Sequence, residues 1–560
     1  MITTPPAAPF RFSQVLALAA AFAAVTALPA QAELTKDRAD GAAAVTIAQC
    51  KEWLGTLASP EFEGRGTGQP GYEKAANYVA AHWKALGLEA RGENGSYFQH
   101  VPWATTKVVA DKTQVVFKKG DAVVLTIPAE QLAGSASASI TGAGEVVLVT
   151  FDAPEGRGRG QGIEVPALKD LEQVDLAGKV VVVHVRAGKD GNARSQAGAQ
   201  FAAITALSGK RAAAVLFATT EPTRGGLQGR RGMGRRSGNT AAAATGRSPG
   251  AVTFGGDQWA QFLNAAAVTP DALASAPLTQ PTGVTASVAI TVEETNAPAM
   301  NVFAVLPGSD PKLRDEYVVI GSHLDHLGRR GDVISPGADD DASGTTGVMA
   351  VASMLAKNPV RPARSILFVC FAGEENGLVG SAYFVDNCPI PLSSMVAELQ
   401  MDMIGRDEEE NMEGNRGEKA EDNRNSIHLV GTQKLAPSLH TLCLQKNEAA
   451  KFDLEYDQEG MFGRSDHANF AKKGVPVAFF FTGLHRDYHQ PSDTPEKIHY
   501  EKLLRVATWV YDIAFELAAQ PGRPEIEPEL WAKYRAGSRN QAPEQPAAPM
   551  AKAKAAGDGR

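Results

Sequence analysis

The second half of the chain alternates apolar runs with helical patterns, and this alternation constrains the fold more than any other feature. Six short apolar runs are typical of buried strands, and they lie at residues 301–306, 317–320, 365–371, 396–403, 427–430 and 475–481. Apolar residues recur at helical spacing at residues 345–356, 378–385, 435–447 and 501–519. Strands that alternate with helices predict an α/β fold, with a mixed, mostly parallel sheet between layers of helices.

Residues 112–295 have a different texture. They contain short β-rich runs separated by glycine-rich and polar turns, with one helical segment near 196–208. A chain of 560 residues exceeds what one hydrophobic core usually supports, so more than one domain is expected. We therefore interpret 112–295 as a β-rich domain inserted into the α/β domain, whose two parts are residues 33–111 and 296–520. The insert has no cluster of His, Asp, Glu or Cys, which places the chemistry elsewhere.

The two ends of the chain are also distinctive. Arg11 precedes an apolar run at 15–28, and Pro29-Ala30-Gln31-Ala32 follows it, a pattern typical of a signal peptide, residues 1–32, cleaved after Ala32. The run is shorter than the roughly 20 residues of a membrane span, although an uncleaved anchor is the alternative. The mature protein is thus expected to be exported, periplasmic or secreted, without stable membrane insertion. Proline, alanine and lysine dominate residues 521–560, which predicts a disordered tail.

The overall charge does not favour nucleic acid as a partner. The formal net charge is -8 at pH 7, which gives no global attraction to polyanions or to anionic membranes. A basic Arg/Gly segment at 224–247 is of a kind that can contact nucleic acid. In an exported acidic chain, we interpret it as a flexible surface loop.

The four cysteines are too few for a disulfide scaffold. Cys370 lies inside an apolar run and is interpreted as a small buried residue, not a ligand. Cys388 and Cys443 can form a disulfide in an oxidising compartment, and the sequence leaves open whether they do.

Residues of metal-binding type gather where the expected strands end. In open α/β sheets, ligands bind in the crevice beyond the carboxyl ends of the strands. The residues at or after these ends are His323, Asp325, Glu374, Glu375, Asp402 and His489, and Asp339, Asp340 and Asp341 open the helix at 345. Each alone has an ordinary explanation as a cap, a core histidine or a solvated acid. It is much less probable that all of these residues lie at strand ends by chance.

The mixture of residue types points to a hydrolytic metal site. Histidines with carboxylates and no cysteine suit zinc or a related divalent ion in an open catalytic site. Two metals about 3.5–4 Å apart can share a bridging carboxylate and hold a water between them, which lowers the pKa of the water and polarises a scissile carbonyl. A carboxylate that is not a ligand can then serve as general base.

Six motifs, in this order, carry a family resemblance: SHLDHLG, PGADDDASG, FAGEENGLVGS, QMDMIGR, GRSDHANF and DYHQPSDT. With them, residues 301–520 resemble the secreted zinc aminopeptidases of metallopeptidase family twenty-eight, and LASPEFEGRGTGQPGYEKAANY is similar to the start of bacterial members. The insert, with DLAGKVVVV and AAAVLF, resembles a protease-associated (PA) domain. The resemblance implies a zinc-exopeptidase fold, two zinc ions, and removal of N-terminal residues from peptide substrates.

The resemblance also implies which residues hold the metals. Asp340 would bridge both ions. His323 and Asp402 would complete the ligands of one ion, and Glu375 and His489 those of the other. His326 matches no constant ligand of the family.

Further residues receive catalytic or supporting roles from the same resemblance. Glu374 would be the general base, and Asp325 would hold the His323 ring in the ligating tautomer. Tyr488 matches a position where some members place a phenol that stabilises the tetrahedral oxyanion. Asp339 and Asp341 are interpreted as loop or helix-start residues, and Asp466 and His467 as a structural or pocket-wall pair.

Other functions remain as alternatives. A carboxypeptidase of the same fold acting on acidic peptides would need a basic cluster, for which Arg406 and Arg464 are few. A cyclising relative would use one zinc ion, whereas ligands for two are present. A catalytically inactive, receptor-like binding protein would have lost ligands that this chain keeps. The sequence leaves the N-terminal residue preference and the oligomeric state open.

Overall fold

The computed structural model describes residues 34–136, 138–153, 174–186, 199–200, 202–204, 206–207, 210–223, 226–229, 233–234, 251–274, 278–413, 415 and 417–537. The predicted signal peptide, residues 1–32, therefore lies outside the described residues. Within the described ranges, no helix combines the length and the apolarity that a membrane crossing requires.

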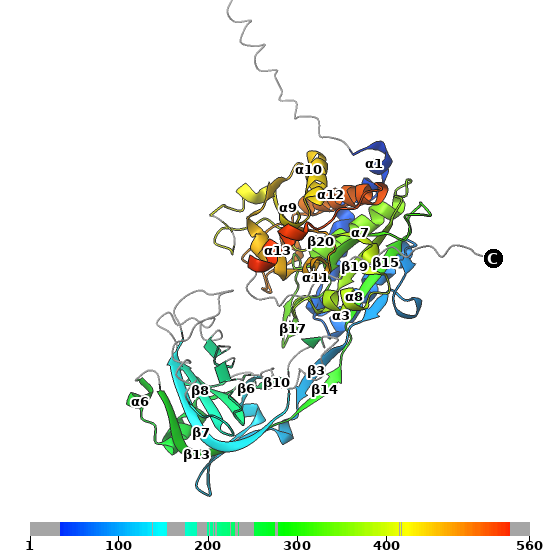
Figure 1. Ribbon diagram of the computed structural model, residues 1–560. Coiled ribbons are helices and arrows are strands. Elements are labelled where there is room, and N and C mark those ends of the chain that lie inside the picture. The colour runs from blue at the N-terminus through cyan, green and yellow to red at the C-terminus, as the bar shows by residue number, and fades with distance from the viewer. Residues whose placement is uncertain are drawn as a thin grey trace, which may run out of the picture.

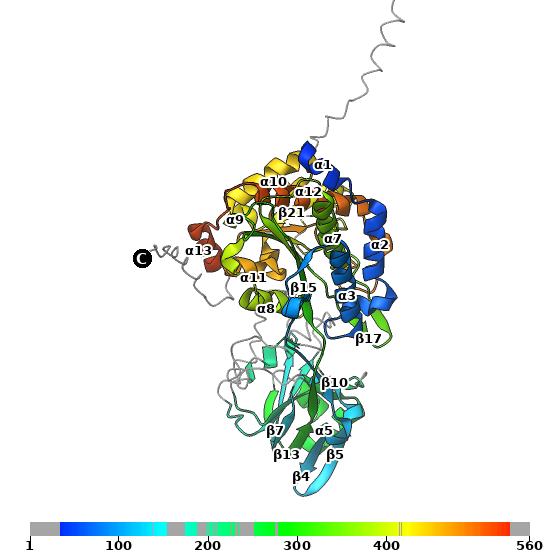
Figure 2. The ribbon, with the colours of Figure 1, turned by 90° about the vertical axis from the view of Figure 1, so that its right-hand side faces the viewer.

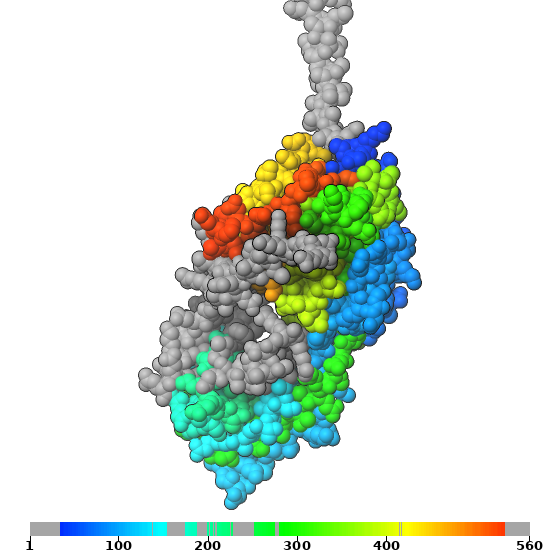
Figure 3. Space-filling view, turned by 45° about the vertical axis from the view of Figure 1, so that its right-hand side comes forward, coloured from blue at the N-terminus to red at the C-terminus, as the bar shows by residue number. Residues whose placement is uncertain are grey.

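The described residues form two bodies joined by a ribbon of two main strands, to which the short strand β11 (Met233–Gly234) is added at one edge (Figures 1 and 2). The ribbon consists of β3 (Trp103–Val108) and β14 (Val292–Asn296), which pair antiparallel along their length. In the space-filling view the insert, in cyan and green, forms a lobe below the larger α/β body (Figure 3). The chain thus leaves the larger body through β3 and returns to it through β14.

The larger body is built on a mixed sheet. Within the described residues the strand order is β1-β15-β19-β16-β20-β23-β21-β22, and β2 also pairs with β15. The strands are β1 Glu89–Ala90, β2 Phe98–His100, β15 Met300–Leu306, β16 Tyr317–His323, β19 Ser365–Phe371, β20 Met395–Met401, β21 Ser426–Val430, β22 Asp453–Glu455 and β23 Val477–Phe481. The central strands β19, β16, β20 and β23 are parallel to one another. On either side, β15 pairs antiparallel with β19, and β21 pairs antiparallel with β23. The sheet is therefore mixed, as the sequence predicts, but parallel pairing is confined to β19, β16, β20 and β23 and to the edge pair of β21 and β22, so it is not mostly parallel.

Helices cover both faces of this sheet, which explains why its strands are apolar throughout. Every residue of β15, β16, β19, β20 and β23 is buried, as parallel strands covered on both faces require. One apolar core lies under α2 (Ile47–Leu57), α3 (Pro70–Ala85), α7 (Ala342–Lys357), α10 (Pro437–Ala450) and α12 (Tyr500–Ala519). The opposite core lies under α8 (Val379–Asn387), α9 (Thr432–Leu435), α11 (His467–Lys472) and α13 (Pro528–Gly537). Helix α1 (Lys36–Ala42) and the hairpin of β17 (Gly328–Arg330) and β18 (Val333–Ser335) complete this body.

The insert has its own sheet and its own apolar cores. The strand order among the described residues is β10-β6-β12-β9-β8-β7-β13-β4-β5. The elements are β4 Gln114–Lys119, β5 Ala122–Pro128, β6 Ala133–Ala136, β7 Ile140–Asp152, β8 Val180–Arg186, β9 Ala214–Thr219, β10 Leu227–Gly229, β12 Val252–Gly255, α5 Asp257–Ala266, α6 Pro270–Ala274 and β13 Leu278–Ile290. The sequence did not indicate β6, β12 or α5, because their short runs mix small and polar residues.

Two expectations require correction in this part of the chain and at its end. The Arg/Gly segment at 224–247 was expected to be a flexible loop; most of it lies outside the described residues, but two short stretches pair as strands, β10 with β6 and β11 (Met233–Gly234) with β3. The tail was expected to be disordered from residue 521, yet α13 packs on the larger body. Trp531 is buried in the core beneath α8, and the main-chain N–H of Glu527 donates to the carbonyl of Leu435. One tryptophan supplies an apolar anchor that the average composition of the tail conceals.

All four cysteines are free thiols. Cys388 packs against the core under α8, whereas Cys443 lies in the core under α10, so the sheet separates them. The disulfide that the sequence left open is therefore absent.

Candidate metal centre

The residues expected at the site come from the carboxyl ends of four adjacent parallel strands. His323 is the last residue of β16, Glu374 and Glu375 follow β19, and Asp402 follows β20. His489 lies in the loop after β23, and Asp340 lies two residues before the start of α7. Because these strands end at the same edge of the sheet, their loops converge on one crevice.

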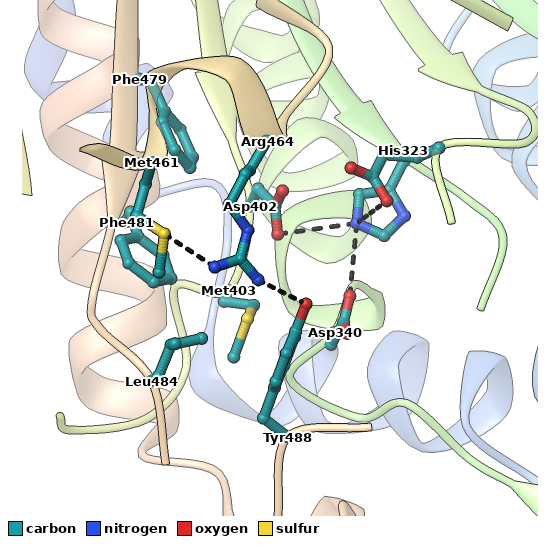
Figure 4. Close-up of a pocket in the computed structure, with 11 residues that line it drawn as sticks. His323, Asp340, Asp402, Met403, Met461, Arg464, Phe479, Phe481, Leu484 and Tyr488 are labelled. Carbon is teal, nitrogen blue, oxygen red and sulfur yellow. Dashed lines mark hydrogen bonds and ion pairs between the residues drawn. The ribbon is translucent and has the colours of Figure 1, made fainter. Parts of the chain in front are cut away.

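Asp340 stands between two sets of side chains. Its Oδ1 lies 3.3 Å from Nε2 of His323, and the same nitrogen lies 3.5 Å from Oδ1 of Asp402. Its Oδ2 lies 3.2 Å from Nε2 of His489, which in turn lies 3.0 Å from Oε2 of Glu375. The close-up shows His323, Asp340 and Asp402 facing one another (Figure 4). The two oxygens of one carboxylate thus face two separate donor sets, the arrangement of a bridging ligand.

His326 also lies at this centre, although the sequence analysis did not predict it as a ligand. Its Nδ1 lies 2.8 Å from Oε1 of Glu375 and 3.5 Å from Oδ2 of Asp340. The ring is 2 % exposed. Its position in the same loop as His323 could have indicated a place at the metal centre. His326 was not predicted as a ligand because it matches no constant ligand of the family.

Asp325 supports the site through two of its groups. Nδ1 of His323 lies 3.0 Å from the main-chain carbonyl of Asp325 and 3.8 Å from its Oδ1. Since a carbonyl only accepts, Nδ1 carries the proton and Nε2 keeps its lone pair for the centre. The carboxylate instead accepts a hydrogen bond of 3.1 Å from the main-chain N–H of Glu374. Asp325 therefore orients the His323 ring mainly through its backbone and fixes Glu374 through its side chain.

The two aspartates beside Asp340 are scaffold residues. Asp341 caps α7, because its Oδ1 accepts from the N–H of Gly344 at 2.8 Å. Asp339 accepts from the N–H of Gly405 at 2.7 Å and lies 3.2 Å from Nε2 of His485. The helix-start and loop roles expected for this pair are confirmed.

The electrostatics of the centre require positive charge. Burial, together with the carboxylates of Glu375 and Asp402, raises the pKa of Glu374 well above its ordinary value, although His323 opposes this shift. Burial alone would lower the pKa of His489, but Asp340 and Glu375 raise it to about 10. Bare carboxylates at this density hold protons on themselves and on the histidines, and metal cations replace those protons.

Several buried atoms of the centre lack a hydrogen-bond partner within the described residues. They are Oδ2 of Asp340, Oε1 of Glu375 and both ring nitrogens of His326. One atom from each of these three residues lies within 4.8 Å of the others, and the same holds for His323, Asp340 and Asp402. Buried polar atoms are normally satisfied, so this donor set fits divalent metal ions on both sides of Asp340.

A pocket opens beside the centre (Figure 4). It spans about 340 Å³, part of which is open to solvent, and its lining comprises His323, Asp340, Glu374, Asp402, Met403, Met461, Arg464, Phe479, Phe481, Leu484 and Tyr488. Apolar side chains form the wall opposite His323, and Arg464 lies between that wall and the acids. Nη2 of Arg464 donates to the hydroxyl of Tyr488 at 3.2 Å. The ring of Tyr488 stacks on that of His489 with centroids 3.8 Å apart.

Asp466 and His467, expected as a structural or pocket-wall pair, take structural positions. His467 is fully buried and stacks on Phe479 with ring centroids 4.5 Å apart, behind the apolar wall. Asp466 is buried beside it, and burial raises the pKa of its carboxyl to about 8. His467 thus supports the wall from behind, while the apolar wall itself consists of residues outside the six motifs, Met461, Phe479, Phe481 and Leu484.

Arg65 is a supporting residue that the sequence did not single out. Its guanidinium is fully buried and donates to the carbonyls of Leu324 at 2.9 Å and Gly337 at 2.8 Å. It also donates to the carbonyls of Leu57 and Pro336 at 2.8 and 2.7 Å. Arg65 thus ties together the loops that carry His326 and Asp340.

We expect Arg65→Met to lower the free energy of unfolding by roughly 3 kcal/mol, because buried carbonyls lose charged donors. Urea unfolding followed by tryptophan fluorescence measures this loss. Arg91→Met is the control, since Arg91 is exposed and pairs only with the nearby Glu89. Equal midpoints for the two variants would contradict the role of Arg65.

Comparisons with known proteins agree with this fold. Residues 301–514 match the model of Peptidase family M28. The chain is similar to a probable leucine aminopeptidase of Arthroderma otae, with 30% identity over 227 residues, 39% of this chain and 57% of the relative. It is also similar to aminopeptidase YwaD of Bacillus subtilis, with 25% identity over 254 residues, 43% of this chain and 49% of the relative. The chain thus spans about half the length of the curated relatives it matches.

A solved structure extends the likeness to most of the chain. The aminopeptidase from Aneurinibacillus sp. strain AM-1 superposes with a TM-score of 0.52 at 21% identity. The match covers 88% of this chain and 98% of that one. The α/β fold is therefore shared with an aminopeptidase structure.

Proposed function

We propose that this chain is an exported zinc aminopeptidase of family M28 that removes N-terminal residues from peptides. The observation that carries the proposal is the position of Asp340, whose two oxygens face separate donor sets. His323 and Asp402 would hold one zinc ion, and Glu375 and His489 would hold the other, with His326 adjacent to the second. Donors of this type, without cysteine, suit zinc in a catalytic site.

Glu374 would serve as the general base. When bound, the zinc ions supply Lewis acidity that polarises the scissile carbonyl and lowers the pKa of water. Glu374 lines the pocket with Oε2 4.0 Å from Nε2 of His323. From there its carboxylate accepts a proton from the attacking water and delivers it to the leaving amine.

Tyr488 would stabilise the developing oxyanion. Its hydroxyl accepts a hydrogen bond from Arg464, so its own proton remains available to a substrate oxygen in the pocket. Burial raises the pKa of this phenol, which keeps it protonated as a donor. Arg464 positions the hydroxyl and adds positive charge nearby.

The pocket chemistry favours an apolar N-terminal side chain. Met461, Phe479, Phe481 and Leu484 offer an apolar wall, and removing such a side chain from water is favourable. Among the described lining residues, Arg464 is the only guanidinium or ammonium group, and it pairs with Glu413 at 3.3 Å. This lining gives little support to the carboxypeptidase acting on acidic peptides.

Hydrolysis of aminoacyl-p-nitroanilides by the purified protein with zinc tests the proposal. We expect leucyl- and phenylalanyl-p-nitroanilide to be cleaved faster than the glutamyl compound. N-acetyl-leucyl-p-nitroanilide should resist, because an exopeptidase of this type requires the free amine. Equal cleavage of the acetylated substrate, or a protein without zinc and without hydrolysis, would exclude the aminopeptidase function.

The insert and the first 32 residues complete the proposal. We infer that the insert is a PA-like domain and that residues 1–32 direct export. The ribbon attaches the insert next to the crevice side of the larger body, because Trp103 at the start of β3 packs near Gly373, one residue before Glu374.

A further inference from the structure

A second group of metal-binding residues lies away from the proposed zinc centre. Glu408 follows β20 in the loop after Asp402, His428 lies on β21, Glu455 ends β22, and Asp457 follows shortly after. His428 and Glu455 are register partners in the parallel pair of β21 and β22. Strand pairing thus places an imidazole beside a carboxylate, and the loop brings a second carboxylate to them. None of these residues belongs to the zinc centre.

The donor atoms of this group are close together and buried. Nδ1 of His428 lies 3.5 Å from Oε2 of Glu455 and 3.2 Å from Oδ1 of Asp457, while Nε2 lies 3.7 Å from Oε2 of Glu408. One donor atom each of Glu408, His428 and Glu455 lies within 4.8 Å of the other two. His428 is 1% exposed and Glu408 is 0% exposed.

Among the described residues, one atom each of His428 and Glu455 has no hydrogen-bond partner. They are Nδ1 of His428 and Oε2 of Glu455, both buried and directed at each other across 3.5 Å. Lys502, whose charge acts on His428 and Glu455, is already held by Asp407 at 2.8 Å and by the carbonyl of Asn423 at 3.0 Å. Burial of carboxylates without a compensating cation is unfavourable, so the group requires a further positive charge.

We propose that Glu408, His428 and Glu455, with Asp457 beside them, bind a third divalent cation of the zinc type. An imidazole combined with carboxylates favours zinc and related transition metals over calcium or magnesium, which prefer all-oxygen sites. The protonation of the group is compatible with this assignment. Burial lowers the pKa of His428 to about 4, so its ring is neutral and able to ligate, and burial with nearby acids raises the pKa of Glu408 to about 7.

The third cation would secure the loop that borders the catalytic pocket. Glu408 begins a segment in which Glu409 accepts from Arg486 and from Arg406. Glu413, in the same segment, pairs with Arg464 of the pocket at 3.3 Å. Fixing Glu408 to β21 and β22 therefore fixes the contacts that hold Arg464 and the start of the loop that carries Tyr488 and His489.

Counting zinc ions per chain tests the site. The purified full chain is stripped with a chelator, dialysed against zinc chloride, and analysed by inductively coupled plasma mass spectrometry. We expect His428→Ala to bind one ion fewer per chain than the parent. Glu455→Gln keeps the size of a half-buried side chain, so it provides the same comparison if His428→Ala does not fold. His100→Ala is the matched control, because His100 lies 2.7 Å from Glu93 on the exposed surface and should leave the count unchanged.

An Asp340→Ala background separates this site from the proposed zinc centre. In this background, the Asp340→Ala protein should still bind one ion more than the Asp340→Ala/His428→Ala double variant. Zinc should also still raise the Tm of the Asp340→Ala protein. If the folded His428→Ala or Glu455→Gln protein binds as many ions as the parent, the third site is wrong and the group shares a proton instead. If the one-ion difference persists but Asp340→Ala removes no other ion, the zinc centre is wrong and the third site stands.

Discussion

Glu374→Gln is expected to lower the turnover of leucyl-p-nitroanilide by about 10² to 10⁴-fold, the range typical of a lost general base. The amide keeps the size of the side chain but cannot accept a proton from water. Glu374 is not one of the residues that face Asp340 as ligands, so zinc content should stay near the parental value. Steady-state kinetics and the zinc count of the same sample measure both effects.

The control for this substitution is Glu448→Gln, which makes the same chemical change at an exposed position on α10. It should leave kcat and zinc content unaltered. Turnover at the parental rate in Glu374→Gln would show that another group acts as the base. Loss of zinc together with activity would instead make Glu374 a ligand.

Asp340→Ala is expected to remove both proposed zinc ions and to lower activity by more than about 10⁴-fold, beyond the usual loss of a single acid–base group. The reason is geometric, because one carboxylate faces both donor sets. Asp402→Ala should affect only the ion on the His323 side, since Asp402 faces His323 but is absent from the second donor set. Zinc counts of the two variants should therefore differ by one ion per chain.

Asp111→Ala serves as the matched control for Asp340→Ala, because Asp111 is exposed in the short turn between β3 and β4. Its zinc content and activity should equal those of the parent. Circular dichroism of each variant checks that the fold persists. Parental zinc content in folded Asp340→Ala would exclude Asp340 as the bridging ligand.

The strands of the larger body were predictable because burial on both faces leaves a direct trace in the sequence. Strands β15, β16, β19, β20 and β23 are continuous apolar runs, and parallel strands under two helical layers allow little else. The edge of the sheet was less predictable. The short strands β1 and β2 carry exposed polar residues and gain their place only by pairing with β15.

The clustering of candidate ligands was predictable because a topological rule brings strand ends together without knowledge of side-chain contacts. Contacts between distant segments were not. Arg65 meets the carbonyl of Leu324, 259 residues further along the chain, and no local pattern marks such a partner. The group that orients the His323 ring could not be predicted either, because the sequence does not show whether the main-chain carbonyl or the carboxylate of Asp325 contacts the ring. His428 and Glu455 are ordinary residues until strand register places them side by side.

The ribbon that joins the two bodies also determines how the chain can be divided. Val108 and Val292 are direct partners in the ribbon, so the insert begins and ends at neighbouring points of its host. Because the two ends of the insert lie side by side, the insert places almost no geometric constraint on the larger body, and the larger body can keep its own contacts on either side of the junction. The insert interrupts the amino-acid sequence of the larger body but not its fold. The insert can therefore be exchanged as a cassette, and its ancestry can differ from that of the body that carries it.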